Sequence, residues 1–218
     1  MDDIPFLYKE SDRRKSILSN TPGKIYVAPN PNADIHYHEL RALDFVGTHT
    51  VLHYEKMVEH EAQVQGVDPD LVKAIMYVEN AQGAYGYLSE AVNYSDSILP
   101  MNIKRTVWKE LVPGGDFSDP YTNIHAGVTL IKRIQDRLDD PSPEKIATLY
   151  NALAKDSISD YGARVGNVME TKPWDHNILD SIGNSIYNSF HSTPSAPEEH
   201  PEAHGFWDEL RTVGDYFF

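Results

Sequence analysis

Hydrophobic residues recur at helical spacing along much of the chain, most clearly over residues 67–80, VDPDLVKAIMYVEN. Asp68 is placed to cap a helix there, and Pro69 suits the first helical position. Glu79 projects from the apolar face of this helix, because it follows Ile75 by four residues. It also lies at the predicted C-terminal end, where the helix dipole disfavours a negative charge. The pattern therefore places a carboxylate at an energetically costly position.

The same periodicity predicts further helices, and the fold class is mainly α. Residues 118–138 carry one apolar stripe, and Gly127 leaves room for a close neighbour. Residues 81–97 have the Gly and Ser content of a loop, and KIYV at 24–27 has a short strand-like pattern. Besides 67–80, helices are expected from near His36 or Val51 to about Gln65, over 102–112, over 118–138, over 142–153 and over 159–170.

Changes in composition along the chain predict one central domain with irregular extensions on both sides. The helical patterns are concentrated in residues 55–170. Residues 1–54, rich in turn signals, are expected to form an N-terminal extension that packs on this domain or precedes it. Residues 171–218 are expected to form a C-terminal linker and tail, because HSTPSAPEEHPEAHG is rich in Pro, Ser and Glu.

Composition and charge exclude several classes of function. No run of about eighteen apolar residues exists, so no membrane insertion is expected. The charged start MDDIPFLYKESDRRK lacks the apolar segment of a secretory signal. A formal net charge of −14 argues against nucleic acid and anionic lipid as partners. The chain has no cysteine, which excludes disulfides and thiol catalysis.

The residues alone leave two interpretations of Glu79 open. Its side chain reaches solvent at a frayed helix end, or it lies in a partly apolar cleft where desolvation raises its pKa and makes it a proton donor near neutral pH. The ten histidines suggest metal binding, and His36 and His38 are suitably spaced for one face of a strand. However, no H-E-x-x-H pair is present, so neither a metal nor a cofactor is expected.

Several blocks in a fixed order resemble the lytic transglycosylases of the lysozyme-like superfamily, which are related to goose-type lysozymes. The resemblance covers about half of the chain, residues 55–170, and implies a lysozyme-like helical domain. In that family the first block carries the catalytic glutamate, here Glu79. The blocks are VDPDLVKAIMYVEN, SILPMNI from Ser97, DPYTNIHAGVTLIKRI from Asp119, LYNAL from Leu149 and YGARV from Tyr161.

The resemblance implies a reaction on the glycan strands of peptidoglycan. Glu79 would protonate the β-1,4 glycosidic oxygen between N-acetylmuramic acid and N-acetylglucosamine. It would then remove a proton from the 6-hydroxyl of the muramic acid, which closes a 1,6-anhydro ring. The family lacks a second catalytic carboxylate and relies on the acetamido group of the substrate. Glu79 is therefore expected to act as both general acid and general base.

The resemblance also implies roles for other residues. Tyr150 would place its hydroxyl near Glu79 or the sugar, and Asn151 would orient this segment or bind an acetamido group. The remaining expected substrate-binding residues are Asn80, Ser97, Met101, Asn102 and Asp96.

The chain departs from the family pattern at three positions. Pro100 replaces a glutamine that lines the cleft in many relatives, so that polar contact is absent or supplied elsewhere. Leu153 replaces the glycine after the Tyr-Asn pair, and Asn80 replaces the serine next to the glutamate. These changes affect the expected substrate contacts more than the expected class of reaction.

Two alternatives to the transglycosylase remain. A hydrolysing goose-type lysozyme or phage lysis enzyme would need a base to activate water, and Asp96 and Glu90 lie in the expected loop. A protein of another class would keep the fold only for peptidoglycan binding or assembly. The leading interpretation is an antibacterial effector made in the cytoplasm without a secretory signal and delivered by a contact-dependent system. It would act on peptidoglycan in the periplasm or outside the cell, with an immunity or inhibitor protein as its partner.

Overall fold

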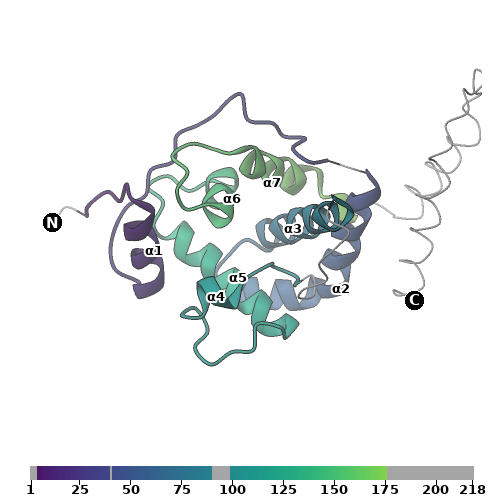
Figure 1. Cartoon of the computed structure of the whole chain (residues 1–218), viewed down its shortest axis with the longest axis horizontal. Helices are drawn as coiled ribbons and strands as arrows, with labels where there is room; N and C mark the ends of the chain where they lie inside the picture. The colour runs from purple at the N-terminus through teal and green to yellow at the C-terminus, as the bar shows by residue number, and fades with distance from the viewer. Residues whose placement is uncertain (1–3, 40, 90–98, 176–218) are drawn as a thin grey trace, which may run out of the picture. The chain divides into compact units, whose positions relative to one another are not determined.

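The computed structural model describes residues 4–39, 41–89 and 99–175, and helices dominate them (Figure 1). The expected mainly α fold is therefore confirmed. These residues contain seven α-helices, one short 3-10 helix and no β-strand. The helices are α1 Glu10–Ser19, α2 Arg41–Gln65, α3 Pro69–Ser89, α4 Arg105–Trp108, α5 Pro120–Gln135, α6 Pro143–Asn151 and α7 Asp160–Thr171, followed by the 3-10 helix η1 Pro173–Asp175.

The centre of this unit is the pair α2 and α3, which share the most extensive contact between helices. Helix α7 packs on α3 and α6 packs on α7, while α5 contacts both α2 and α6 (Figure 1). The apolar faces of these helices form one continuous hydrophobic core. The predicted stripe on α5 is part of this core, and all of its members are buried: Ile124, Val128, Ile131, Ile134 and Leu138.

A tight turn joins α2 to α3 and sets their relative direction. Gly66 has a positive φ of 68°, and the backbone N–H of Val67 donates to the carbonyl of Ala62 at 2.9 Å. This is the Schellman arrangement, in which glycine ends a helix without steric cost. The carboxylate of Asp68 then accepts from the backbone N–H of Asp70 at 2.9 Å. The predicted start of α3 is therefore confirmed.

Helix α3 is longer than the sequence pattern predicted. Residues 81–89 were expected to form a loop, but the helix continues to Ser89. Glycine lowers helix stability by about 1 kcal/mol relative to alanine and does not block the helix as proline does. No proline lies between Pro69 and Pro100, so the glycines of this segment are tolerated.

The strand-like segment at residues 24–27 forms isolated bridges instead of a strand. Lys24 pairs with Phe6, Ile25 with Leu138, and Ala28, directly after the segment, with Ser157. Because the three bridges use different partner segments, no continuous ladder develops. The alternation expected of an extended segment is still present, since Ile25 is buried and Tyr26 is exposed. The expectation of a short strand was therefore wrong, although the backbone is extended enough to pair.

Residues 4–39 are tied to the helical core through a buried arginine. Arg13 on α1 is 1% exposed and donates to the carbonyls of Leu153 and Lys155 at 2.8 and 2.9 Å. It also forms an ion pair with Asp156 at 2.7 Å. Ile17, from the same helix, is part of the hydrophobic core. The N-terminal segment thus shares its packing with the loop that follows α6.

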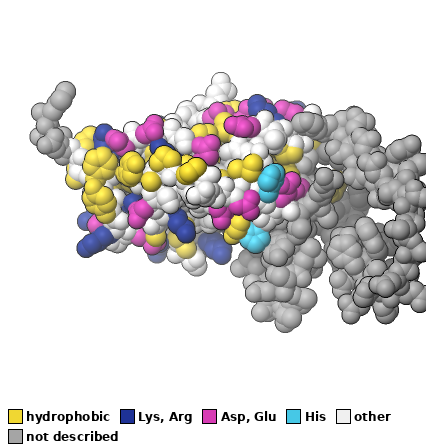
Figure 2. All heavy atoms as spheres, turned by 90° about the horizontal axis from the view of Figure 1, so that it is seen from above, with side chains coloured by type: hydrophobic (Ala, Val, Ile, Leu, Met, Phe, Trp, Pro, Cys, Tyr) yellow, Lys and Arg dark blue, Asp and Glu magenta, His cyan; other side chains and the backbone are white. Residues whose placement is uncertain are grey.

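At the other end of the described chain, residues 173–175 form η1 and bring Trp174 into the core near Tyr77. The rest of the expected linker and tail lies outside the described residues. On the face shown in Figure 2, hydrophobic, acidic and basic side chains are interspersed. Among the described helices, none combines the length and the apolar character needed to cross a membrane.

Candidate active site

Glu79 lies near the middle of α3, ten residues before the helix ends at Ser89. The helix dipole acts mainly on the first and last turns. The expected contribution of a helix terminus to the chemistry of Glu79 was therefore wrong. Its flanking residues Val78 and Asn80 are buried, and Glu79 itself is half-buried. The residue as a whole is thus partly exposed, while burial dominates the environment of its carboxyl group.

Two side chains donate hydrogen bonds to the carboxyl group of Glu79. The hydroxyl of Tyr161, from α7, donates to Oε1 at 2.7 Å. The amide of Asn102, from the segment before α4, donates to Oε2 at 2.8 Å. Each oxygen therefore has one fixed partner, and the two partners come from different elements. This arrangement fixes the orientation of the carboxyl group.

Burial raises the pKa of Glu79 above its usual value. The hydrogen bonds from Asn102 and Tyr161, together with the charge of Lys104, act in the opposite direction. Burial outweighs them, so the protonated form persists to a higher pH than in an exposed glutamate. The same hydrogen bonds stabilise the carboxylate once the proton has left. The environment therefore supports both protonation states that proton transfer requires.

Tyr150 lies next to this carboxyl group but does not bond to it. Its hydroxyl donates to the carbonyl of Met101 at 2.6 Å. Burial raises its pKa well above the usual value, and the negative charge of Glu79 adds to this effect. Tyr150 therefore stays protonated and holds the backbone immediately before Asn102.

A buried asparagine fixes the segment that carries Asn102. The side-chain oxygen of Asn123, on α5, accepts from the backbone N–H of Met101 at 2.9 Å. Its amide donates to the carbonyls of Ile103 and Phe117 at 3.1 and 3.3 Å. The same helix carries Gly127, where a Cβ atom would lie 2.8 Å from Cβ of Met101. The expected close approach at Gly127 is therefore confirmed.

Asn80 is buried, and its side-chain amide forms hydrogen bonds to backbone carbonyls of the protein itself. Its amide donates to the carbonyl of Met76 at 2.7 Å and to that of Pro100 at 2.9 Å. Its side-chain oxygen has no partner among the described atoms. Asn80 thus ties α3 to the segment of Met101 and Asn102, and a role in binding substrate stays a prediction.

For the other predicted site residues, the structure gives no support for a direct role in binding substrate. Met101 is fully buried, so its side chain does not line a cleft and only its carbonyl belongs to the site. Asn151 is exposed at the end of α6, and no hydrogen bond joins it to the Glu79 cluster. Ser97 and Asp96 lie outside the described residues, as does Glu90.

Sequence reasoning assigned no role to Tyr161, which makes a direct contact with Glu79. The available signal was the YGARV block, which was noted for its resemblance alone. Tyr161 lies in the first turn of α7, where the side chain of Ser159 accepts from the backbone N–H of Gly162 at 3.2 Å. This cap sets the start of α7 and so directs the Tyr161 hydroxyl at α3.

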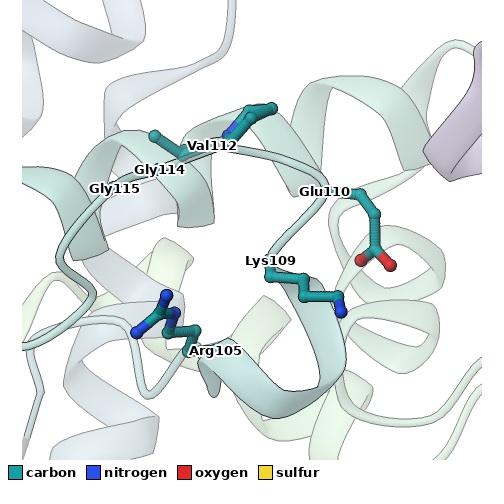
Figure 3. Close-up of a pocket in the computed structure, with 7 residues that line it drawn as sticks. Arg105, Lys109, Glu110, Val112, Gly114 and Gly115 are labelled. Atoms are coloured by element: carbon teal, nitrogen blue, oxygen red, sulfur yellow. The ribbon is translucent and has the colours of Figure 1, made fainter.

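Two surface hollows are found elsewhere on the described residues. The larger one, about 340 Å³, is lined by residues 105–115 and is shown in Figure 3. The smaller one, about 100 Å³, lies beside Asp44, Tyr77 and Arg164. No group of three or more potential metal ligands gathers anywhere in residues 4–39, 41–89 and 99–175.

Comparisons of the chain with protein-family models, with curated proteins and with solved structures each find no match. The chemistry of the site therefore has to be inferred from its own geometry. That geometry is the carboxyl group of the half-buried Glu79, with a raised pKa, held by a tyrosine and an asparagine from two other elements.

Proposed function

We propose that the protein cleaves the glycan strands of peptidoglycan as a lytic transglycosylase, with Glu79 as the general acid and base. The observation that carries this proposal is the protonation chemistry of Glu79: burial raises its pKa, while the residue as a whole remains partly exposed. A general acid needs a pKa near the working pH and access to the leaving group. The resemblance of the sequence blocks to the transglycosylases supplies the substrate class.

In the first step, protonated Glu79 transfers its proton to the glycosidic oxygen as the bond from this oxygen to C1 of N-acetylmuramic acid breaks. The N-acetylglucosamine leaves with a free 4-hydroxyl. The acetamido oxygen of the muramic acid attacks C1 and takes up the developing positive charge. Tyr161 and Asn102 stabilise the Glu79 carboxylate formed in this step, because each donates to one of its oxygens.

In the second step, the Glu79 carboxylate removes the proton of the 6-hydroxyl of the same sugar. The 6-oxygen bonds to C1 while the bond from C1 to the acetamido oxygen breaks, which restores the acetamido group. The product is a 1,6-anhydro sugar, and Glu79 is protonated again. No water is consumed, so the product is one water lighter than a hydrolysed strand.

In many of the transglycosylases, a glutamine at the position of Pro100 makes a polar contact in the cleft. We infer that Asn102 supplies this contact here. It is exposed and lies beside Glu79, with its amide on Oε2. Tyr150 and Asn123 fix the backbone on both sides of it. We infer that Asn102 orients Glu79 and contacts the substrate, whereas Tyr150 acts as a positioning residue through Met101.

The test is mass spectrometry of the soluble products released from purified sacculi. The wild-type protein is expected to release muropeptides with anhydro ends, and Glu79→Gln is expected to lower the rate by about 10²–10⁴-fold, the usual contribution of a general acid. The matched control is Glu170→Gln, because Glu170 is exposed on α7 and takes part in no ion pair among the described residues. This control should retain the wild-type rate.

Two other results would contradict the proposal in different ways. Hydrated reducing ends would identify a hydrolase and direct attention to the segment that contains Glu90 and Asp96. Absence of product from the wild-type protein, with sacculus binding retained, would indicate a binding module that keeps the fold without the activity.

A further inference from the structure

Three cations without ion-pair partners follow Asn102 within seven residues, although the whole chain carries a formal net charge of −14. They are Lys104, Arg105 and Lys109, which are exposed and form no ion pair or side-chain hydrogen bond within the described residues. Elsewhere, Lys73 is held by two glutamates and Lys145 pairs with Asp140, whereas lysines such as Lys56 and Lys155 are unpaired but isolated in the sequence. Three cations within six residues of an acidic protein form a local concentration of positive charge, which favours an anionic ligand there.

Arg105 and Lys109 line the 340 Å³ hollow, and glycines form its opposite wall (Figure 3). Gly114 has a positive φ of 78°, a conformation that favours glycine. A Cβ atom on Gly115 would lie 2.7 Å from Cγ1 of Val112 and 2.9 Å from Cγ2 of Thr122, so any larger residue there would displace these side chains. A ligand in the hollow therefore meets bare backbone on one side and two cations on the other.

The hollow carries both signs of charge. Glu110 is part of its lining and is labelled in Figure 3. It forms no ion pair with Lys109 or with any other described residue. Hydrogen bonds from Ser118 lower the pKa of the Asp116 carboxyl group, and the charge of Arg105 lies near enough to add to this effect. Two exposed cations with carboxylates beside them suit a ligand that has carboxylates and an amino group, better than they suit a simple polyanion.

The hollow is close to the proposed catalytic residue. Asn102 bonds to Glu79, and Arg105 follows Asn102 by three residues, so their Cα atoms are at most about 11 Å apart. Lys104, between them, is near enough for its charge to lower the pKa of Glu79, against the larger effect of burial. A substituent of a sugar bound at Glu79 therefore needs to extend only a short distance to reach the hollow.

We propose that the hollow of Arg105, Lys109 and Glu110 binds the peptide stem of peptidoglycan and so directs the enzyme to peptide-bearing glycan. This inference rests on the proposed function, because it takes the substrate from it. An uncrosslinked stem has free carboxylates for the two cations and a free amino group, on its diamino acid, for Glu110. The hollow therefore distinguishes a strand with stems from a bare strand.

The experiment compares cleavage of peptide-bearing glycan strands with cleavage of strands from which an amidase has removed the stems. The variant Arg105→Gln/Lys109→Gln should lower the ratio of the two rates about three- to tenfold, as expected for two exposed ion pairs. The control Lys56→Gln/Lys155→Gln removes the same charge from exposed lysines on α2 and in the loop after α6. Its ratio should equal that of the wild type.

A second measurement does not depend on cleavage. Calorimetry of a synthetic stem tetrapeptide with the Glu79→Gln protein should show binding that the Arg105→Gln/Lys109→Gln substitutions weaken by a similar factor. Raising the salt concentration should weaken it too, because the groups involved are exposed.

The two proposals fail in different ways. If the wild type cleaves both substrates and the double variant changes neither the rate ratio nor tetrapeptide binding, the stem site is wrong and the transglycosylase stands. If the wild type releases no product but the tetrapeptide binds through Arg105 and Lys109, the activity is wrong and the stem site stands. Equally strong binding of inorganic phosphate in the hollow would also overturn the assignment to the peptide stem.

Discussion

At the scale of single residues, the burial of the Glu79 carboxyl group lowers the stability of the folded protein when this group is ionised. Burial raises its pKa in the folded state, whereas in the unfolded chain the pKa keeps the ordinary value of a glutamate, 4.5. The folded protein therefore binds more protons than the unfolded chain at pH values above this. Its free energy of unfolding should fall as the pH rises through this region, because ionised Glu79 is disfavoured only in the folded state.

This cost can be measured with Glu79→Gln, which cannot ionise. We expect the variant to gain stability relative to the wild type as the pH rises from about 5 to about 8, because it lacks the group that loses its proton. Urea unfolding at several pH values measures the difference. Glu170→Gln, at an exposed position, should show no such trend, and parallel curves for Glu79→Gln and the wild type would contradict the raised pKa.

The sequence pattern identified Glu79 but not the reason for its chemistry. Its place on the apolar face of α3 follows from helical spacing, which a sequence displays directly. The contact with Tyr161 joins residues 82 positions apart and depends on how α7 packs against α3. Local periodicity shows which face of α7 is buried but not which neighbour it meets. The pKa of Glu79 therefore had to be derived from the packed structure.

At the scale of elements, the contact between α5 and the segment of Met101 decides whether Asn102 reaches Glu79. Gly127→Ala would place a methyl group 2.8 Å from Cβ and Cγ of Met101. Since Met101 is bonded through both its N–H and its carbonyl, it cannot move alone. We expect a loss of about 1–3 kcal/mol of stability and at least a tenfold loss of activity, of the kind caused by a misplaced site.

The matched control for this prediction is Gly166→Ala on α7. Its added methyl group would meet Cγ and the carboxylate end of Glu144, also at 2.8 Å, but a flexible side chain can rotate away. Urea unfolding and the sacculus assay compare the two variants. Equal effects of Gly127→Ala and Gly166→Ala would show that the segment of Met101 is not held as tightly as the hydrogen bonds indicate.

The elements themselves were largely predictable, because caps and apolar stripes are local signals. The start of α6 is an example, since the hydroxyl of Ser142 accepts from the backbone N–H of Lys145 at 3.4 Å. Helices were expected over 142–153 and 159–170, and α6 and α7 occupy most of these two ranges. The length of α3 was not predictable, because glycine marks loops on average and is overridden by packing in a particular helix.

At the scale of the whole described unit, Arg13 connects the N-terminal segment to the loop after α6. Arg13→Met should cost about 1–3 kcal/mol, because it leaves the buried carbonyl of Leu153 and the partly buried carbonyl of Lys155 without their donor, whereas the exposed Asp156 remains solvated. Chemical unfolding measures this loss. Lys24→Met is the matched control, since its ion pair with Asp139 is exposed and worth less than about 1 kcal/mol.

Similar losses for Arg13→Met and Lys24→Met would show that residues 4–39 rest on the helices without stabilising them. The sequence could not settle this point. Arg13 is one of 19 basic residues, and nothing in its neighbourhood distinguishes a buried arginine from a solvated one. Its burial results from contacts with residues 140 and more positions later in the chain.

The three hydrogen bonds of Asn123 hold the backbone at both ends of the segment that forms the hollow. They fix the backbone at Met101 and Ile103 on one side and at Phe117 on the other. Residues 104–116, which include the lining of the hollow, lie between these fixed points, and Leu111 within the segment is itself part of the hydrophobic core.

Substitutions at the exposed positions of this segment, such as Arg105, Lys109 and Glu110, should therefore change the lining of the hollow while Asn102 keeps its place beside Glu79. Under the proposed function, substrate preference would then change without disturbing the proposed proton donor.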